Sequence, residues 1–100
     1  MVQINWTIQA VNDLKNIADY ISKDSKRYAK HQVSKLKNRT NILKKHLHFG
    51  RVVPEFNNEN IREIIEGSYR IVYKIVSNKR IDILTVHHSS RDMSKRTFNT

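Results

Sequence analysis

Apolar side chains in the first half of the chain recur with the spacing of two helices. Thr7 can cap the first helix, which should end near Asp24 and Ser25, residues that can cap the second. The apolar positions of the first helix are Ala10, Val11, Leu14, Ile17, Ala18 and Ile21. Those of the second recur at steps of four and three residues and are Ala29, Val33, Leu36, Thr40, Leu43 and Leu47. Because the connection is so short, the two helices should form an antiparallel hairpin.

The second half of the chain has the alternating pattern of β-strands. Residues 61–66 and 69–76 flank Gly67-Ser68, a two-residue type II′ hairpin signal, and a turn around residues 77–80 leads to residues 81–88. Residues 2–6 form another short strand. The predicted order is βααβββ, an α+β fold in which a helical hairpin packs on one face of an antiparallel sheet, and one domain spans residues 1–100. The pattern leaves open whether the first strand pairs beside the second or the fourth.

The two predicted turns determine which side chains share a face of the sheet. The first hairpin places Ile64 opposite Ile71, and a turn centred on residues 78–79 places Arg70 opposite His87. The more apolar face should lie under the helices, and it carries Ile64, Tyr69, Ile71, Tyr73, Ile75, Leu84, Val86 and His88. The other face carries Ile61, Glu63, Ile65, Arg70, Val72, Lys74, Thr85 and His87. The second set permits two interpretations: a functional cluster, or a surface ion pair between an arginine and a glutamate beside an incidental histidine.

Charge narrows the choice of partners. The chain has 19 Lys and Arg against 9 Asp and Glu, a formal net charge of +10, and no acid occurs in residues 25–54. This excess attracts nucleic acid, an acidic protein or an anionic membrane surface, and the alternative is a solvated basic surface without a partner. With an apolar helix beside it, the Lys-rich helix is expected to pack into the core rather than lie on a membrane.

Composition also excludes several classes of site. The chain has no cysteine, so a disulfide framework, a thiolate metal site and a thiol nucleophile are excluded. The five histidines show no metal-binding spacing with carboxylates, and we expect no metal and no cofactor. No apolar run approaches the roughly 20 residues of a membrane span, and no signal peptide is visible. These features predict a cytoplasmic protein with no membrane partner.

Several segments together resemble the RelE/ParE toxin superfamily. They occur in order along nearly the whole chain, and they are Trp6-Thr7, residues 50–55, 61–63 and 67–73, and the tail from Val86 to Asp92. The resemblance implies the toxin of a type II toxin–antitoxin system, a growth inhibitor neutralised by a cognate, small, acidic antitoxin. One branch is ParE-like and acts on DNA gyrase. The other is RelE-like and cleaves messenger RNA on the ribosome without a metal. The tail, with His88 followed by Ser-Ser-Arg-Asp, is closer to the ParE-like pattern, which we therefore favour.

The RelE-like alternative implies a set of catalytic residues. Metal-free RNA cleavage needs a base for the ribose hydroxyl, an acid for the leaving oxygen and a cation for the phosphorane charge. The resemblance assigns the base to Glu55 and the phosphate clamp to Arg70. His87 or His88 would have to act as the acid from a shifted position, because Ser89 and Ser90 stand where such nucleases usually place a histidine or tyrosine, and we favour His87 because it is on the open face.

The ParE-like interpretation requires a binding surface instead of a proton-transfer site. The cations predicted to contact the target or its phosphates are Arg51, Arg70, Lys74, Arg91, Lys95 and Arg96. In either branch, an acidic antitoxin segment should lie across a groove lined by the basic residues of the toxin and pair with a sheet edge. A free-standing basic nucleic-acid-binding domain is the third alternative. It ranks last because Tyr69 and Tyr73 are predicted to point inward, which leaves few aromatics for base stacking.

Overall fold

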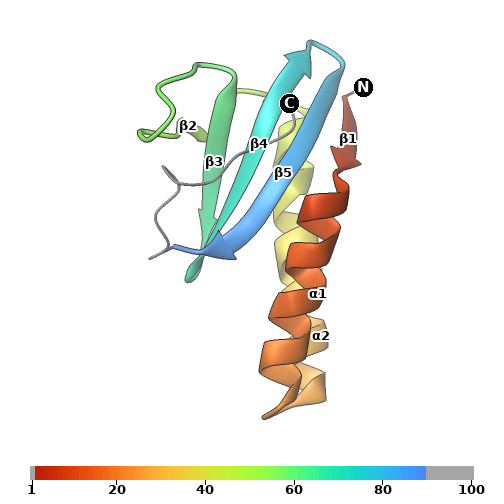
Figure 1. Cartoon of the computed structure of the whole chain (residues 1–100). Coiled ribbons are helices and arrows are strands. Elements are labelled where there is room, and N and C mark those ends of the chain that lie inside the picture. Colours follow the sequence, from red (N-terminus) through yellow and green to blue (C-terminus); the bar gives the residue numbers. More distant parts are fainter. Residues whose placement is uncertain (1, 90–100) are drawn as a thin grey trace.

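The predicted helical hairpin is confirmed in a computed structural model, which describes residues 2–89. Helix α1 (Ile8–Ser22) begins at Thr7, whose hydroxyl accepts a hydrogen bond from the Ala10 N–H. Helix α2 (Lys26–Arg39) begins at Ser25, whose hydroxyl accepts from the Tyr28 N–H. The apolar stripe of the second helix continues beyond the α-helix itself, through the 3₁₀ helix η1 (Thr40–Lys44). The two helices lie side by side against one face of the sheet (Figure 1).

The sheet has five strands and is mixed rather than antiparallel. Its strands are β1 (Gln3–Trp6), β2 (Arg51–Val52), β3 (Ile61–Glu66), β4 (Tyr69–Ser77) and β5 (Arg80–His88), in the spatial order β1-β5-β4-β3-β2. The expectation of an antiparallel sheet was wrong for β1, which pairs in parallel with β5. The helical hairpin returns the chain to the end of the sheet where β1 starts, so β3 and β5 run in the same direction as β1 (Figure 1). The short strand β2 was not predicted.

The register of the hairpins agrees with the sequence except from Tyr73 to Ile75, a stretch bounded by two irregularities where β4 is displaced by one residue against β5. Ile64 lies opposite Ile71 on β3 and β4, and Gly67 adopts the positive φ of 60° that the turn requires. Between β4 and β5, Arg70 lies opposite His87 as predicted, but the register shifts by one residue after Val72. This shift moves Leu84 off the helix-covered face to which the sequence assigned it.

The apolar side chains form two clusters, one on each face of the sheet. The larger one lies between the helices and the sheet, and its buried members are Ala10, Leu14, Leu36, Leu43, Ile64, Ile71, Tyr73, Ile75, Ile81, Ile83 and Val86. The smaller one consists of Val53, Val72 and Leu84, with Phe56 and Ile61 packed against it. Both faces of the central strands therefore bury apolar side chains, and the face with the smaller cluster also carries Arg70.

A buried tyrosine attaches the segment after η1 to the sheet. Tyr73 is fully buried, and its hydroxyl donates to the Leu47 carbonyl oxygen at 2.8 Å and accepts from the Gly50 N–H at 2.9 Å. Gly50 must approach closely, because a Cβ atom there would lie 2.6 Å from the Glu63 carbonyl oxygen. This contact fixes where β2 begins, and with it the position of Arg51.

No helix within residues 2–89 is both long and apolar enough to cross a membrane.

Candidate functional site

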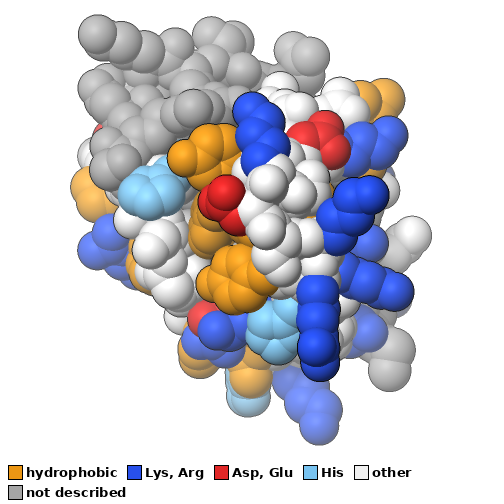
Figure 2. Space-filling model, turned by 90° about the horizontal axis from the view of Figure 1, so that it is seen from below, with side chains coloured by type: hydrophobic (Ala, Val, Ile, Leu, Met, Phe, Trp, Pro, Cys, Tyr) orange, Lys and Arg blue, Asp and Glu red, His pale blue; other side chains and the backbone are white. Residues whose placement is uncertain are grey.

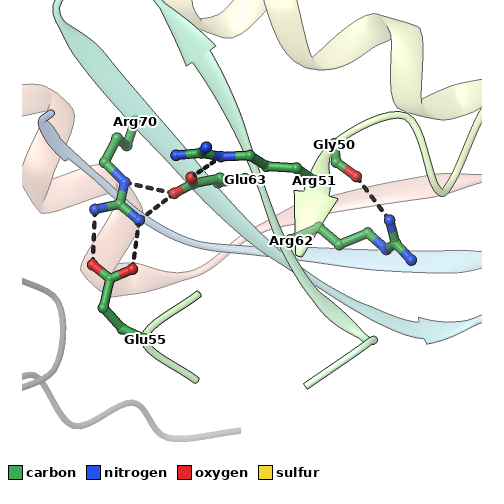
Figure 3. A network of polar contacts seen from close by, with 6 residues as sticks. All are labelled: Gly50, Arg51, Glu55, Arg62, Glu63 and Arg70. Carbon is green, nitrogen blue, oxygen red and sulfur yellow. Dashed lines mark hydrogen bonds and ion pairs between the residues drawn. The ribbon is translucent and has the colours of Figure 1, made fainter. Parts of the chain in front are cut away.

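A chain of ion pairs crosses the sheet face that the helices leave uncovered. Arg70 on β4 donates from Nε to Glu63 Oε1 on β3 at 2.5 Å, and its two terminal nitrogens contact both carboxylate oxygens of Glu55 at 3.0 and 3.2 Å. On the far side of Glu63, Arg51 Nε donates to Oε2 at 2.5 Å. Two guanidiniums and two carboxylates therefore alternate in one network (Figure 3).

Glu55 reaches this network because the loop between β2 and β3 turns back on itself. The N–H groups of Phe56 and Asn57 both donate to the Val53 carbonyl oxygen at 3.2 Å. Asn57 has a φ of 47°, a left-handed conformation that asparagine adopts more readily than most residues. Val53 is fully buried in the smaller apolar cluster and so holds the start of the loop in place. The loop thereby holds Glu55 over Arg70.

The network is buried most deeply at Glu63. The Glu63 side chain is 0% exposed and that of Arg70 is 7% exposed, whereas that of Arg51 is 64% exposed. A carboxylate buried this deeply needs charged hydrogen-bond donors, and two guanidiniums contact Glu63 here. Burial by itself lowers the pKa of Arg70, but the hydrogen bonds to Glu55 and Glu63 outweigh it, and the pKa of the guanidinium is raised overall. Arg70 therefore remains charged throughout the accessible pH range.

The structure brings some predicted site residues together and separates others. Glu55 and Arg70 are in direct contact, and His87 lies opposite Arg70 on β5 with 4% exposure. Lys74 is further along β4, opposite Asp82. The remaining predicted cations, Arg91, Lys95 and Arg96, lie outside the described residues.

Sequence reasoning named Glu55, Arg70 and Arg51 as candidate site residues and Glu63 as a possible partner of Arg70, but it did not predict that the four form one ion-pair network. It also missed Asp13 on α1, whose carboxylate accepts hydrogen bonds from the Thr85 hydroxyl and, at 3.0 Å, from the Val86 N–H. Asp13 thus supplies a hydrogen-bond acceptor to the part of β5 that lies beyond its pairing with β1. An acid beside the apolar stripe of α1 was the available signal.

A second candidate surface is the basic side of α2 and η1. An open groove of about 670 Å³ lies there, lined by His31, Ser34, Lys35, Asn38, Arg39, Asn41, Ile42, Lys45 and Glu66. Glu66 contacts Lys35 at 3.9 Å and Arg39 at 3.4 Å. These are exposed pairs that contribute little to stability, so the groove stays cationic and open to an acidic ligand. Within the described part of the chain, no cluster of His, Asp and Glu has the composition of a metal site.

Of the comparisons with known proteins, one shows the family and another shows the fold. A family model described as the ParE toxin of the type II toxin–antitoxin system parDE matches residues 4–93. A solved structure titled "Chromosomal ParDE TA system from P. aeruginosa" is similar, with a TM-score of 0.71 and 23% identity, over 88% of this chain and 96% of that chain. At that identity the likeness shows the shared fold. No curated protein sequence matches.

Proposed function

The chain belongs to the ParE toxin family of type II toxin–antitoxin systems, and from this premise we propose that it acts in the cytoplasm by inhibiting DNA gyrase and that a small acidic antitoxin neutralises it. The action proposed is binding through a surface, without cleavage of RNA. The alternative within the superfamily is a metal-free messenger RNA endoribonuclease with Glu55, Arg70 and His87 as its catalytic residues.

The observation that carries the proposal is the state of Arg70. A phosphate clamp needs guanidinium N–H groups that point at the substrate, but those of Arg70 already contact Glu55 and Glu63. A general base needs an oxygen that can take a proton, and both oxygens of Glu55 accept from Arg70. The two groups needed for cleavage thus satisfy each other. This arrangement favours a structural role for the network and leaves function to the outer surface.

The surface charge supports an acidic antitoxin. The chain carries a net charge of +10, and the groove of α2 and η1 presents Lys35, Arg39 and Lys45. Complementary charge speeds association and selects against basic partners. An acidic segment in this groove would also replace Glu66 as the partner of the two cations that Glu66 contacts.

Two assays on the purified toxin separate the two activities. We expect inhibition of gyrase-catalysed supercoiling, and no codon-phased cuts when a message is translated in its presence. Glu55→Gln is the decisive variant, because glutamine retains the shape of glutamate but removes its basic oxygen. A gyrase inhibitor should keep its activity in this variant. Codon-phased cleavage by the wild type that is lost in Glu55→Gln would establish the nuclease instead.

The antitoxin proposal has its own test. The toxin should copurify with a small acidic protein encoded beside it, and the complex should weaken as salt rises, since screening acts on exposed charges. Charge reversal at Lys45 should weaken the complex, whereas reversal at Lys79, in the exposed β4–β5 turn, should not. Equal effects of the two reversals would remove this groove from the interface.

A further inference from the structure

Aromatic side chains gather between the tip of the helical hairpin and the nearby ends of β4 and β5. Tyr20 of α1 is 73% exposed and Tyr28 of α2 is 55% exposed, which is unusual for rings of this size. Across from them, the rings of Tyr69 and His88 meet edge to face with centroids 5.9 Å apart. Next to Tyr28 lies His31, at 6.5 Å between centroids. We name these five residues the aromatic face.

The members of the aromatic face are close enough to act together. Burial raises the pKa of the Tyr69 hydroxyl, and the nearby hydroxyls of Tyr28 and Tyr20 raise it further. An open pocket of about 400 Å³ lies between α1 and the strands, and Asn16, Tyr20, Tyr69 and His88 are among the residues that line it. Figure 2 looks at the molecule from below and shows hydrophobic and histidine side chains in the middle of the view, with an acidic side chain among them.

Lys and Arg side chains lie along one side of this face. The Lys23 ammonium lies 5.9 Å from the centre of the Tyr20 ring, a cation–π distance. Residues 23–39 contain seven Lys and Arg and a single acid, Asp24. Asp13 lines the pocket, and its carboxylate is engaged by β5. Glu66, which pairs with Tyr69 across β3 and β4, contacts Lys35 and Arg39. In Figure 2, Lys and Arg side chains border the hydrophobic centre, chiefly along one side.

Exposed rings interleaved with cations match one class of ligand. Single-stranded nucleic acid binds where bases stack on aromatic side chains and the phosphates follow a basic track. In a duplex the bases are stacked on one another, so their faces cannot stack on protein side chains. An acidic peptide without aromatic side chains has no ring to stack on the exposed tyrosines. The Asn16 side chain adds an amide that can both donate to and accept from the edge of a base.

We propose that the aromatic face binds unpaired bases of single-stranded nucleic acid, with one base stacked on Tyr20 in the pocket beside Tyr69 and the phosphates held by Lys23 and the cations of α2. This surface lies on the helix side of the sheet, away from the Arg70 network. It does not depend on the gyrase proposal. The expectation that stacking aromatics are few overlooked Tyr20 and Tyr28, which belong to the helices. Tyr73 and Tyr69 both face the core under the helices as predicted, and Tyr69 remains half-buried.

Binding is measured by fluorescence anisotropy of the full-length toxin with labelled oligothymidylate, oligouridylate and a duplex of equal length. We expect both single strands to bind more tightly than the duplex. Tyr20→Ala should weaken single-strand binding by about 5- to 150-fold, the effect of losing one stacked base. Tyr20→Phe should restore it, because the ring is what stacks. Lys23→Gln should lower the salt dependence of binding and leave the preference for single strands intact.

The matched control is Ile8→Ala, which also truncates a highly exposed apolar side chain of α1, 82% exposed, outside the aromatic face. It should bind as the wild type does. The proposal is overturned if the duplex binds as tightly as the single strands, if Tyr20→Ala and Ile8→Ala behave alike, or if polyglutamate competes as well as an oligonucleotide at equal charge. It is equally overturned if the toxin binds no oligonucleotide, or if Tyr20→Ala changes only self-association in sedimentation.

Discussion

Replacing Arg70 by methionine tests the buried ion-pair network most directly. The substitution keeps an unbranched side chain of similar length and removes the charge. Glu63, with 0% exposure, then keeps only Arg51, whose side chain is 64% exposed. Breaking a buried pair by removal of one partner costs about 3–5 kcal/mol, because it leaves an uncompensated charge. Against a total stability of about 5–15 kcal/mol for a domain, such a loss brings the protein near unfolding.

The assay is urea and thermal unfolding followed by circular dichroism. For a domain of this size, the loss corresponds to a fall in Tm of at least about 12 °C. The matched control is Arg80→Met, because Arg80 pairs with Asp82 at 2.9 Å but its side chain is 50% exposed. That pair should contribute less than about 1 kcal/mol. Combining Arg70→Met with Glu63→Met should recover much of the lost stability, since the fully buried carboxylate is then removed as well and Glu55, at 23% exposure, can still reach solvent.

Two results would refute this reasoning. One is a cost for Arg70→Met as small as that for Arg80→Met. The other is a double variant no more stable than Arg70→Met alone, which would mean that packing rather than charge determines the loss. Either would also weaken the argument that Arg70 is committed to the fold.

Three further predictions concern other contacts. Gly50→Ala should destabilise the fold by at least about 1–3 kcal/mol, because its Cβ would meet the Glu63 carbonyl at 2.6 Å, and chemical denaturation measures this cost. Burial raises the pKa of the Tyr73 hydroxyl above its ordinary value of 10.0, although the hydrogen bond from Gly50 acts in the opposite direction. At a pH just above about 10, the native state therefore keeps a proton that the unfolded chain has lost. Stability should therefore fall as pH rises above about 10, and alkaline unfolding of Tyr73→Phe should show a smaller slope. Asp13→Ala should cost about 1–3 kcal/mol in thermal unfolding, since it leaves the Thr85 hydroxyl and its neighbouring N–H without their acceptor; a cost near zero would mean that the end of β5 needs no cap.

The parts of the fold that were predictable depend on local signals. The caps at Thr7 and Ser25 and the turn at Gly67 are short-range choices, and each was confirmed. The parallel pairing of β1 was not predictable, because its partner lies far along the chain and a strand of four residues has too little pattern to select it. The register shift after Val72 was equally invisible, since no glycine or other residue with special backbone preferences marks it.

The candidate site likewise combines local features that the sequence predicts with a non-local contact that it does not. Turn geometry alone placed Arg70 opposite His87 and put Glu63 on the same face. The approach of Glu55 depends on a loop without periodicity, anchored by the burial of Val53 and turned at Asn57. The Glu55 carboxylate changes the role expected for Arg70. The sequence suggested a cation available to a ligand, but Arg70 already pairs with Glu55 and Glu63. A non-local contact therefore decided what the local pattern left ambiguous.

The pairing of β1 with β5 also affects how the toxin emerges from the ribosome. Asn5 and Asp82, joined by a side-chain hydrogen bond, are 77 positions apart, and bringing such distant points together costs about 4 kcal/mol of chain entropy. β1 can find its neighbour only after residues 80–83 have been translated, on the order of ten seconds after β1 itself at bacterial elongation rates. A nascent chain therefore carries an incomplete sheet for most of its synthesis. The strand order therefore sets a lower limit on the time at which the described sheet can be complete, because β5, the partner of β1, is also the last strand of that sheet to be synthesised.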